Sequence, residues 1–292
     1  MKTKGLLTAI ILLSIFAFNI TGLKAQDVLN GVYVKEHVKD RKPIPYQYLR
    51  ESDVMWSKTI WRVIELKEKM NHSLYYPEEP IGERKSLISL LMWAIQNQGL
   101  TAYNYSTYDE FATVMTMKEI EERFGAKDEV VMVEDVENPD GPMIEKTIEG
   151  SYNTSDVKQY LVKELWFFDK QRSVLEVRII GLCPILFSTR TNEEGDDGGE
   201  EAIEKKKLFW VYFPEARKIF ANNEVFNPFN DAERKSYDDI FFKRLFSSYI
   251  VQESNAYNDR LIEEYTVGME ALLEADRIKE SIFNFEQDLW EY

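Results

Sequence analysis

Residues 53 to 70 read Asp-Val-Met-Trp-Ser-Lys-Thr-Ile-Trp-Arg-Val-Ile-Glu-Leu-Lys-Glu-Lys-Met and carry more apolar surface than one face of a helix needs. Plotted at about 100° per residue, the charged side chains share one narrow sector and the apolar ones spread over roughly 240° of arc. The pattern predicts a helix with two apolar stripes, one with Trp56 and Ile60 and one with Trp61 and Ile64. Such a helix is buried on several sides, in its own core or partly against another subunit.

Helical periodicity recurs in four later segments. A helix is predicted from Ser86 to Asn97 with Gly99 as its stop, and another follows Thr116, ends at Gly125 and has the spacing of a capping box. A third is predicted from Ser236 to about Tyr249. The fourth is a long terminal helix whose apolar residues are spaced 4, 3, 4, 3, 4: Ala271, Ala275, Ile278, Ile282, Phe285 and Leu289. This stripe favours packing on the parent domain, with docking on another subunit as the alternative.

The middle of the chain has the alternation and the turns of β-hairpins. One hairpin is predicted from residues 129–134 and 143–148 around Asn-Pro-Asp-Gly, and a second from 160–168 and 173–182. Both faces of the second are apolar, which places it centrally. Residues 208–213 form a further predicted strand. Helices, antiparallel strands and helices again indicate the α+β class.

The start of the chain has the pattern of a secretory signal peptide. A basic head is followed by an apolar run from Leu6 to Ile20 and a small residue, Ala25, so we expect cleavage near Ala25. A membrane anchor is the alternative, but the run is short for a span. The expected mature chain, residues 26–292, divides into an extended arm (26–48), a helical part (49–125), a β-rich part (129–213) and a second helical part (214–292). The arm packs either on its own domain or on a neighbour.

Charge narrows the choice of partners. The full chain has a formal net charge of −15, and removal of residues 1–25, which contain three lysines and no acid, makes it −18. This excess disfavours binding to nucleic acid or to anionic lipid. An acidic, glycine-rich stretch at residues 192–206 is predicted to be a flexible loop. It lacks the ligand spacing of a calcium loop.

Candidate catalytic chemistry is sparse. The two histidines, His37 and His72, have no second metal ligand at helical spacing, and phosphate loops, nucleophile elbows and redox cysteine pairs are missing from the sequence. Cys183 lies in an apolar setting that favours a buried thiol over a reactive one. Adjacent acids such as Asp238 and Asp239 arise by chance in so acidic a chain. We therefore expect a protein that is not an enzyme and that needs no cofactor and no metal.

Several long sequence segments resemble those of a known family. They are Arg-Lys-Pro-Ile-Pro-Tyr at residues 41–46, Asp-Val-Met-Trp-Ser-Lys at 53–58, Glu-Leu-Trp-Phe-Phe-Asp-Lys-Gln-Arg-Ser at 164–173, Ile-Ile-Gly-Leu-Cys-Pro at 179–184 and Asn-Phe-Glu-Gln-Asp-Leu-Trp-Glu-Tyr at 284–292. Through these segments the chain resembles the GldN/PorN family over nearly all of its mature length. The acidic loop carries none of the resemblance.

The resemblance implies a periplasmic, non-enzymatic subunit of the type IX secretion and gliding motility machinery. It implies self-association in a ring beneath the outer membrane together with an outer-membrane lipoprotein of the GldK/PorK type, and contact with the periplasmic region of a GldM/PorM-type motor protein. The candidate residues for partner contact are Trp56, Ile60, Trp61, Ile64, Ile282, Phe285 and Leu289. The alternative function is a periplasmic protein that binds or hydrolyses cell-wall glycan.

Overall fold

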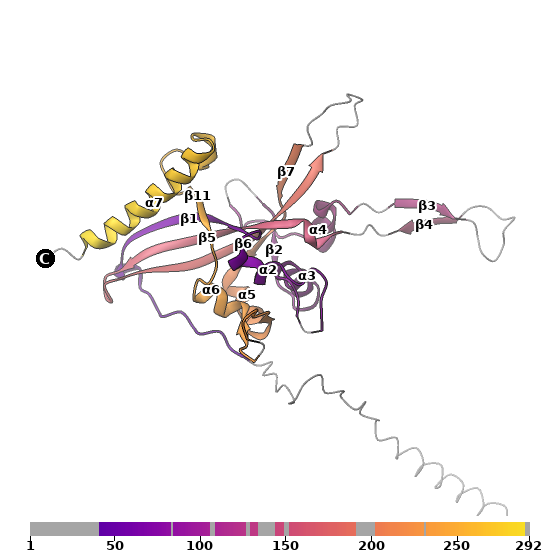
Figure 1. Ribbon diagram of the computed structural model, residues 1–292, viewed down its shortest axis with the longest axis horizontal. Helices are drawn as coiled ribbons and strands as arrows, with labels where there is room; N and C mark the ends of the chain where they lie inside the picture. The colour runs from indigo at the N-terminus through magenta and orange to yellow at the C-terminus, as the bar shows by residue number, and fades with distance from the viewer. Residues whose placement is uncertain are drawn as a thin grey trace, which may run out of the picture. The chain divides into compact units, whose positions relative to one another are not determined.

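A seven-stranded antiparallel sheet forms the centre of the fold (Figure 1). This computed structural model describes residues 41–82, 84–105, 109–126, 129–133, 144–148, 152–190, 202–230 and 232–289, all within the compact unit Asp40–Tyr292. The strand order is β11-β1-β5-β6-β8-β2, and β7 also pairs with β6. The predicted signal peptide, the arm up to residue 40 and residues 192–201 lie outside the described residues.

The strands of this sheet come from both ends and the middle of the chain. They are β1 (Val54–Glu65), β2 (Ala102–Tyr103), β5 (Val157–Asp169), β6 (Val174–Arg190), β7 (Ala202–Lys207), β8 (Trp210–Tyr212) and β11 (Tyr249–Glu253). Two smaller antiparallel pairs are β3 (Glu129–Val133) with β4 (Ile144–Ile148) and β9 (Glu224–Val225) with β10 (Lys235–Ser236). The two predicted hairpins, β3–β4 and β5–β6, are confirmed.

The helices are α2 (His72–Tyr75), α3 (Leu87–Asn97), α4 (Met117–Phe124), α5 (Phe213–Asn222), α6 (Tyr237–Phe242) and α7 (Met269–Asp288). The predictions of α3 and α4 are confirmed, including the capping box of Thr116 and Glu119. Gly99 and Gly125 follow these helices with φ of 68° and 97°, the left-handed conformation that glycine adopts without strain. A mixed arrangement of helices around an antiparallel sheet confirms the α+β class.

The predicted helix at residues 53–70 is wrong, because residues 54–65 form β1. This strand lies between β5 and β11, with Ile60 opposite both Glu164 and Glu253. An inner strand that is covered on both faces has apolar residues on both. When such a strand is plotted at about 100° per residue, its apolar residues spread around most of the circle and resemble a buried helix. The β-branched residues Thr59, Ile60, Val63 and Ile64 favour the strand.

Two further boundaries differ from the predictions. The helix predicted from Ser236 to Tyr249 ends at Phe242, because Arg244 adopts a left-handed backbone with φ of 53° and the chain then enters β11. Residues 202–206, which the prediction placed in a loop, belong instead to β7 and pair with β6.

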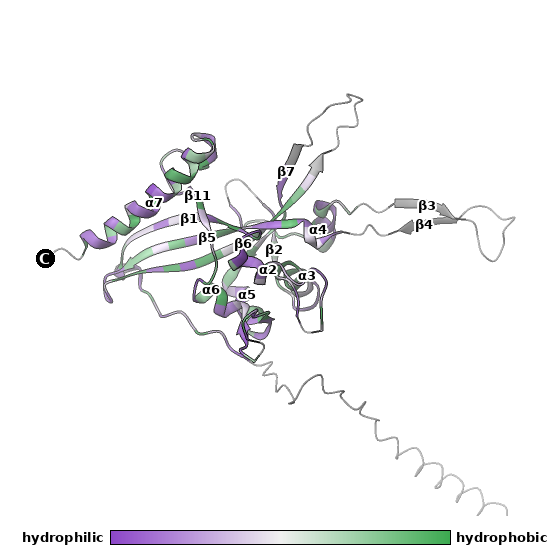
Figure 2. Ribbon diagram, viewed as in Figure 1, coloured by the Kyte–Doolittle hydropathy of each residue, from purple (hydrophilic) through white to green (hydrophobic). Residues whose placement is uncertain are grey.

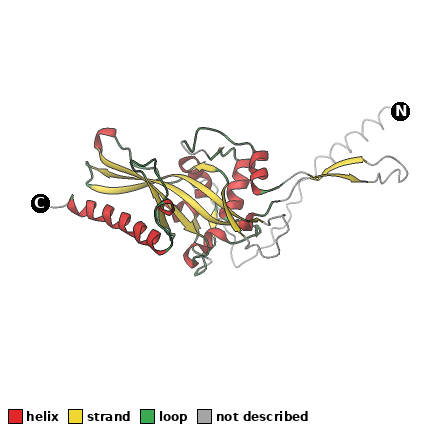
Figure 3. Cartoon of the chain, turned by 90° about the horizontal axis from the view of Figure 1, so that it is seen from above, coloured by secondary structure: helices red, strands yellow, loops and turns green. Residues whose placement is uncertain are grey.

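Helix α7 covers one end of the sheet (Figure 3). Its buried residues Ala275, Ile278 and Ile282 pack with Ile60 of β1 and Ile250 of β11. A separate and larger core joins α3, α5 and α6 to the other end of the same sheet face. The predicted stripe on the terminal helix therefore packs on its parent domain.

Candidate partner-binding surface

The candidate contact residues fall into three different surroundings. Trp56, Ile60, Ile282 and Phe285 lie together where β1 meets α7, and the Trp56 and Phe285 ring centroids are 4.8 Å apart. We call these four residues the β1–α7 cluster. Ile60 and Ile282 are buried in it, whereas Trp56 and Phe285 are only half-buried. Leu289 follows the last residue of α7 and is exposed.

Trp61 points to the opposite face of the sheet from Ile60, because neighbouring residues of a strand alternate between faces. It is buried beside Val63, Leu161 and Cys183. Its indole Nε1 donates to Oε1 of Glu110 at 3.2 Å, and Lys163 Nζ lies 2.6 Å from Oε2 of the same carboxylate. The Lys163 ammonium also lies 5.1 Å from the Trp61 ring centroid, a cation–π contact.

Ile64 belongs to the main core with α3, α5 and α6 and is fully buried. The structure therefore brings together four of the seven candidates, separates Trp61 on the other face and encloses Ile64. Trp56, Phe285 and Leu289 retain accessible surface.

A buried ionic group, which sequence reasoning missed, connects β5 to the turn after α6. Glu164 is fully buried, and Arg244 Nη2 lies 2.9 Å from Oε1 and 3.1 Å from Oε2 of its carboxylate. The indole of Trp166 donates to the same carboxylate at 2.9 Å. Alternation along β5 places Glu164 on the same face as Val162 and Trp166. A charged residue on this apolar face was the sequence signal that could have predicted the buried ionic group.

The described part of the arm packs on its own chain. The ring of Tyr46 lies 4.3 Å from the Arg217 guanidinium and 5.1 Å from that of Arg178. Arg178 Nη2 also donates to the Gln47 carbonyl at 2.7 Å, and burial raises the pKa of Tyr46. Beneath this ring Arg217 makes two hydrogen bonds of 2.8 and 3.2 Å to the carboxylate of Asp238. Tyr46 thus covers an internal ion pair.

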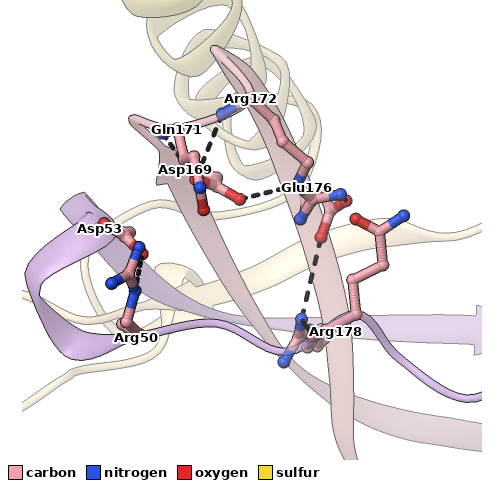
Figure 4. Close-up of polar contacts among 8 residues, drawn as sticks. Arg50, Asp53, Asp169, Gln171, Arg172, Glu176 and Arg178 are labelled. Carbon is pink, nitrogen blue, oxygen red and sulfur yellow. Dashed lines mark hydrogen bonds and ion pairs between the residues drawn. The ribbon is translucent and has the colours of Figure 1, made fainter.

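The turn between β5 and β6 carries a polar cluster (Figure 4). Arg172 donates through Nε to Oδ2 of Asp169 at 2.7 Å and also bonds Glu176. The backbone N–H of Gln171 donates to Oδ1 of Asp169 at 2.8 Å. The hydrogen bond from Arg172 is the main reason why the pKa of Asp169 is lowered. These contacts hold the turn and pair both of its carboxylates with Arg172.

Cys183 and His72 were the other candidates for chemistry. Cys183 is fully buried, and burial raises the pKa of its thiol to about 12, which agrees with the predicted buried thiol. His72 is exposed, and its Nε2 lies 3.2 Å from the Lys67 carbonyl. Within the described ranges no three His, Cys, Asp or Glu side chains gather as metal ligands would. A hollow beside Glu280, Ser281 and Asn284 is lined by α7 alone.

A family model for the gliding motility associated protein GldN matches residues 49–291. The chain belongs to the GldN family. No curated protein matches it significantly. As a GldN-family protein it is a gliding motility associated protein, and this family is not known for catalysis. Among the residues that the structure describes, no helix combines the length and apolar character needed to cross a membrane.

Proposed function

We propose that this GldN-family chain is a non-enzymatic structural subunit of the type IX secretion and gliding motility complex. The observation that carries the proposal is the family match over residues 49–291, which spans the whole sheet and α7. The burial of the Cys183 thiol agrees with a structural role for that residue.

The place of action in this proposal is the periplasm. The basic, apolar and small-residue order of residues 1–25 supports export. The partners are an outer-membrane lipoprotein of the GldK/PorK type, with which the chain forms a ring, and the periplasmic region of a GldM/PorM-type motor protein. A stable protein interface needs apolar anchors at its centre. Trp56, Phe285 and Leu289 are the residues of the predicted set that still offer apolar surface for one.

Deletion and complementation in the native host test this proposal. Loss of the gene should stop gliding and type IX secretion, and the wild-type chain should restore both. The purified mature chain should change from a small species to a large particle when it is mixed with the lipoprotein partner, as measured by light scattering. Unchanged gliding and secretion in the deletion strain would refute the proposal. Release of sugar from cell wall by the chain alone would support the glycan alternative instead.

A further inference from the structure

The side of α7 that faces away from the sheet carries its own apolar residues. Met269, Leu272, Leu273 and Phe283 are 73, 50, 62 and 56% exposed. Figure 2 shows hydrophobic segments on α7 alongside hydrophilic ones. We call this surface, together with the exposed acids Asp276 and Glu280, the α7 outer face.

The α7 outer face is not the side by which the helix packs on the sheet. At about 100° per residue, Met269, Leu273 and Glu280 lie on the opposite side of the axis from the stripe that includes Ile278 and Ile282. That stripe already buries the helix against β1 and β11. Apolar residues gathered on an exposed helix face mark a contact surface more often than isolated ones do.

Spacing and charge describe what fits this surface. Residues 269, 273, 276, 280 and 283 are separated by 4, 3, 4 and 3 positions, the spacing of a helix that packs along another helix. Asp276 and Glu280 stand in the middle of that seam and make no ion pair within the described ranges. The whole helix has six acids and two bases. A partner must supply apolar side chains and positive charges together.

We infer that the α7 outer face binds a basic amphipathic helix of another protein of the complex, with lysines or arginines opposite Asp276 and Glu280. The inference rests on the proposed function, because it names a contact surface of that assembly. An ion pair between Asp276 or Glu280 and a partner cation would stabilise the complex electrostatically. The same carboxylates would repel acidic helices, which adds specificity.

Charge also disfavours the two rival occupants. A second copy that packed its α7 outer face on this one would bring acids against acids in the seam, and like charges at such positions are destabilising. An anionic lipid surface is repelled by the same acids.

Photo-crosslinking in the native host tests the inference on the full chain. A benzophenone amino acid is placed at position 273 in the α7 outer face and, as a control, at position 118 on an exposed site of α4. We expect a crosslink from position 273 only. The crosslinked peptide, sequenced by mass spectrometry, should come from another protein and carry lysine or arginine beside apolar residues at helical spacing. An adduct with a second copy, an acidic partner peptide, or equal yields at the two positions would overturn the inference.

Charge reversal provides the second measurement. Asp276→Lys with Glu280→Lys should lower the crosslink yield from position 273 at least tenfold. The matched control is Glu270→Lys with Asp288→Lys, which changes the net charge equally on the same helix but lies roughly 100° away from the seam. It should lower the yield less than twofold. The neutral pair Asp276→Asn with Glu280→Gln keeps the test valid should the lysine pair fail to fold, and it should still lower the yield severalfold. Equal yields for the acid-seam variants and the control would contradict the inference.

The two proposals fail in different ways. A deletion strain that stops gliding, combined with no specific adduct at position 273, would remove the α7 contact and leave the structural subunit intact. A specific adduct with a basic peptide, in a host whose gliding and secretion do not need the gene, would support the α7 contact and refute the structural role in that complex.

Discussion

The ion pair under Tyr46 allows a stability prediction with a clear magnitude. Arg217 and Asp238 have side chains only 5 and 9% exposed, and two hydrogen bonds join them. Replacing Asp238 with leucine leaves the Arg217 guanidinium buried without its counter-charge. Removal of one partner of a buried pair costs about 3–5 kcal/mol. Since 1 kcal/mol shifts the melting temperature of a domain this large by about 2–4 °C, we expect a fall of roughly 10 °C.

The control comes from the same chain. Arg277 and Glu274 of α7 form an ion pair of similar length, 2.6 Å, but the Arg277 side chain is 75% exposed. Arg277→Met should therefore cost less than about 1 kcal/mol, because solvent already screens that pair. Each change removes one charge from an arginine–carboxylate pair, so the comparison contrasts a buried pair with an exposed one.

The assays are thermal and urea unfolding of the mature chain, followed by a double-mutant cycle. Arg217→Met combined with Asp238→Leu removes both charges and should recover most of the loss, because an apolar pair of similar volume needs no desolvation of charge. If Asp238→Leu cost no more than Arg277→Met, the ion pair would not be desolvated as described. If the double variant were as unstable as the sum of the two single ones, packing rather than charge would explain the loss.

Three further predictions concern the sheet. Gly181→Ala should destabilise the chain by about 1–3 kcal/mol in the same unfolding assay, because its Cβ would lie 2.6 Å from Cζ of Phe111; an unchanged midpoint would refute this close contact. The Cys183 thiol should react with a maleimide only in denaturant, as measured by intact mass, and rapid labelling of the native chain would contradict its burial. Asp169 has a lowered pKa, so its stabilising effect is present above the unfolded pKa of about 4 and is lost as pH falls through the folded value. The stability gap between wild type and Asp169→Asn should close as pH drops from about 5 to 2 in urea unfolding.

Local signals predicted the elements whose ends are determined by nearby residues. The capping box of Thr116 and Glu119 and the stops at Gly99 and Gly125 are short-range interactions, so α3 and α4 could be predicted from sequence. The β5–β6 hairpin was likewise predicted from alternation and its turn.

Elements that depend on distant partners could not be predicted in this way. The conformation of β1 depends on hydrogen bonding to β5 and β11, which are distant in the sequence, so residues 53–70 alone do not indicate it. The short α6 is explained by Arg244, which leaves the helix and pairs with Glu164 on β5. The β1–α7 cluster joins residues more than two hundred positions apart, so its members could be proposed only one element at a time.

The place of β1 beside β11 has a consequence for the newly made chain. Residues 60–63 pair with residues 249–253, so one edge of β1 has no partner until almost the whole chain has been synthesised. An unpaired apolar strand edge is a template for aggregation. A product truncated before Tyr249 would keep that edge open permanently, and we expect it to be degraded or to aggregate rather than to accumulate as a shortened subunit. The pairing of β1 with a strand near the end of the chain therefore makes a complete sheet dependent on full-length synthesis.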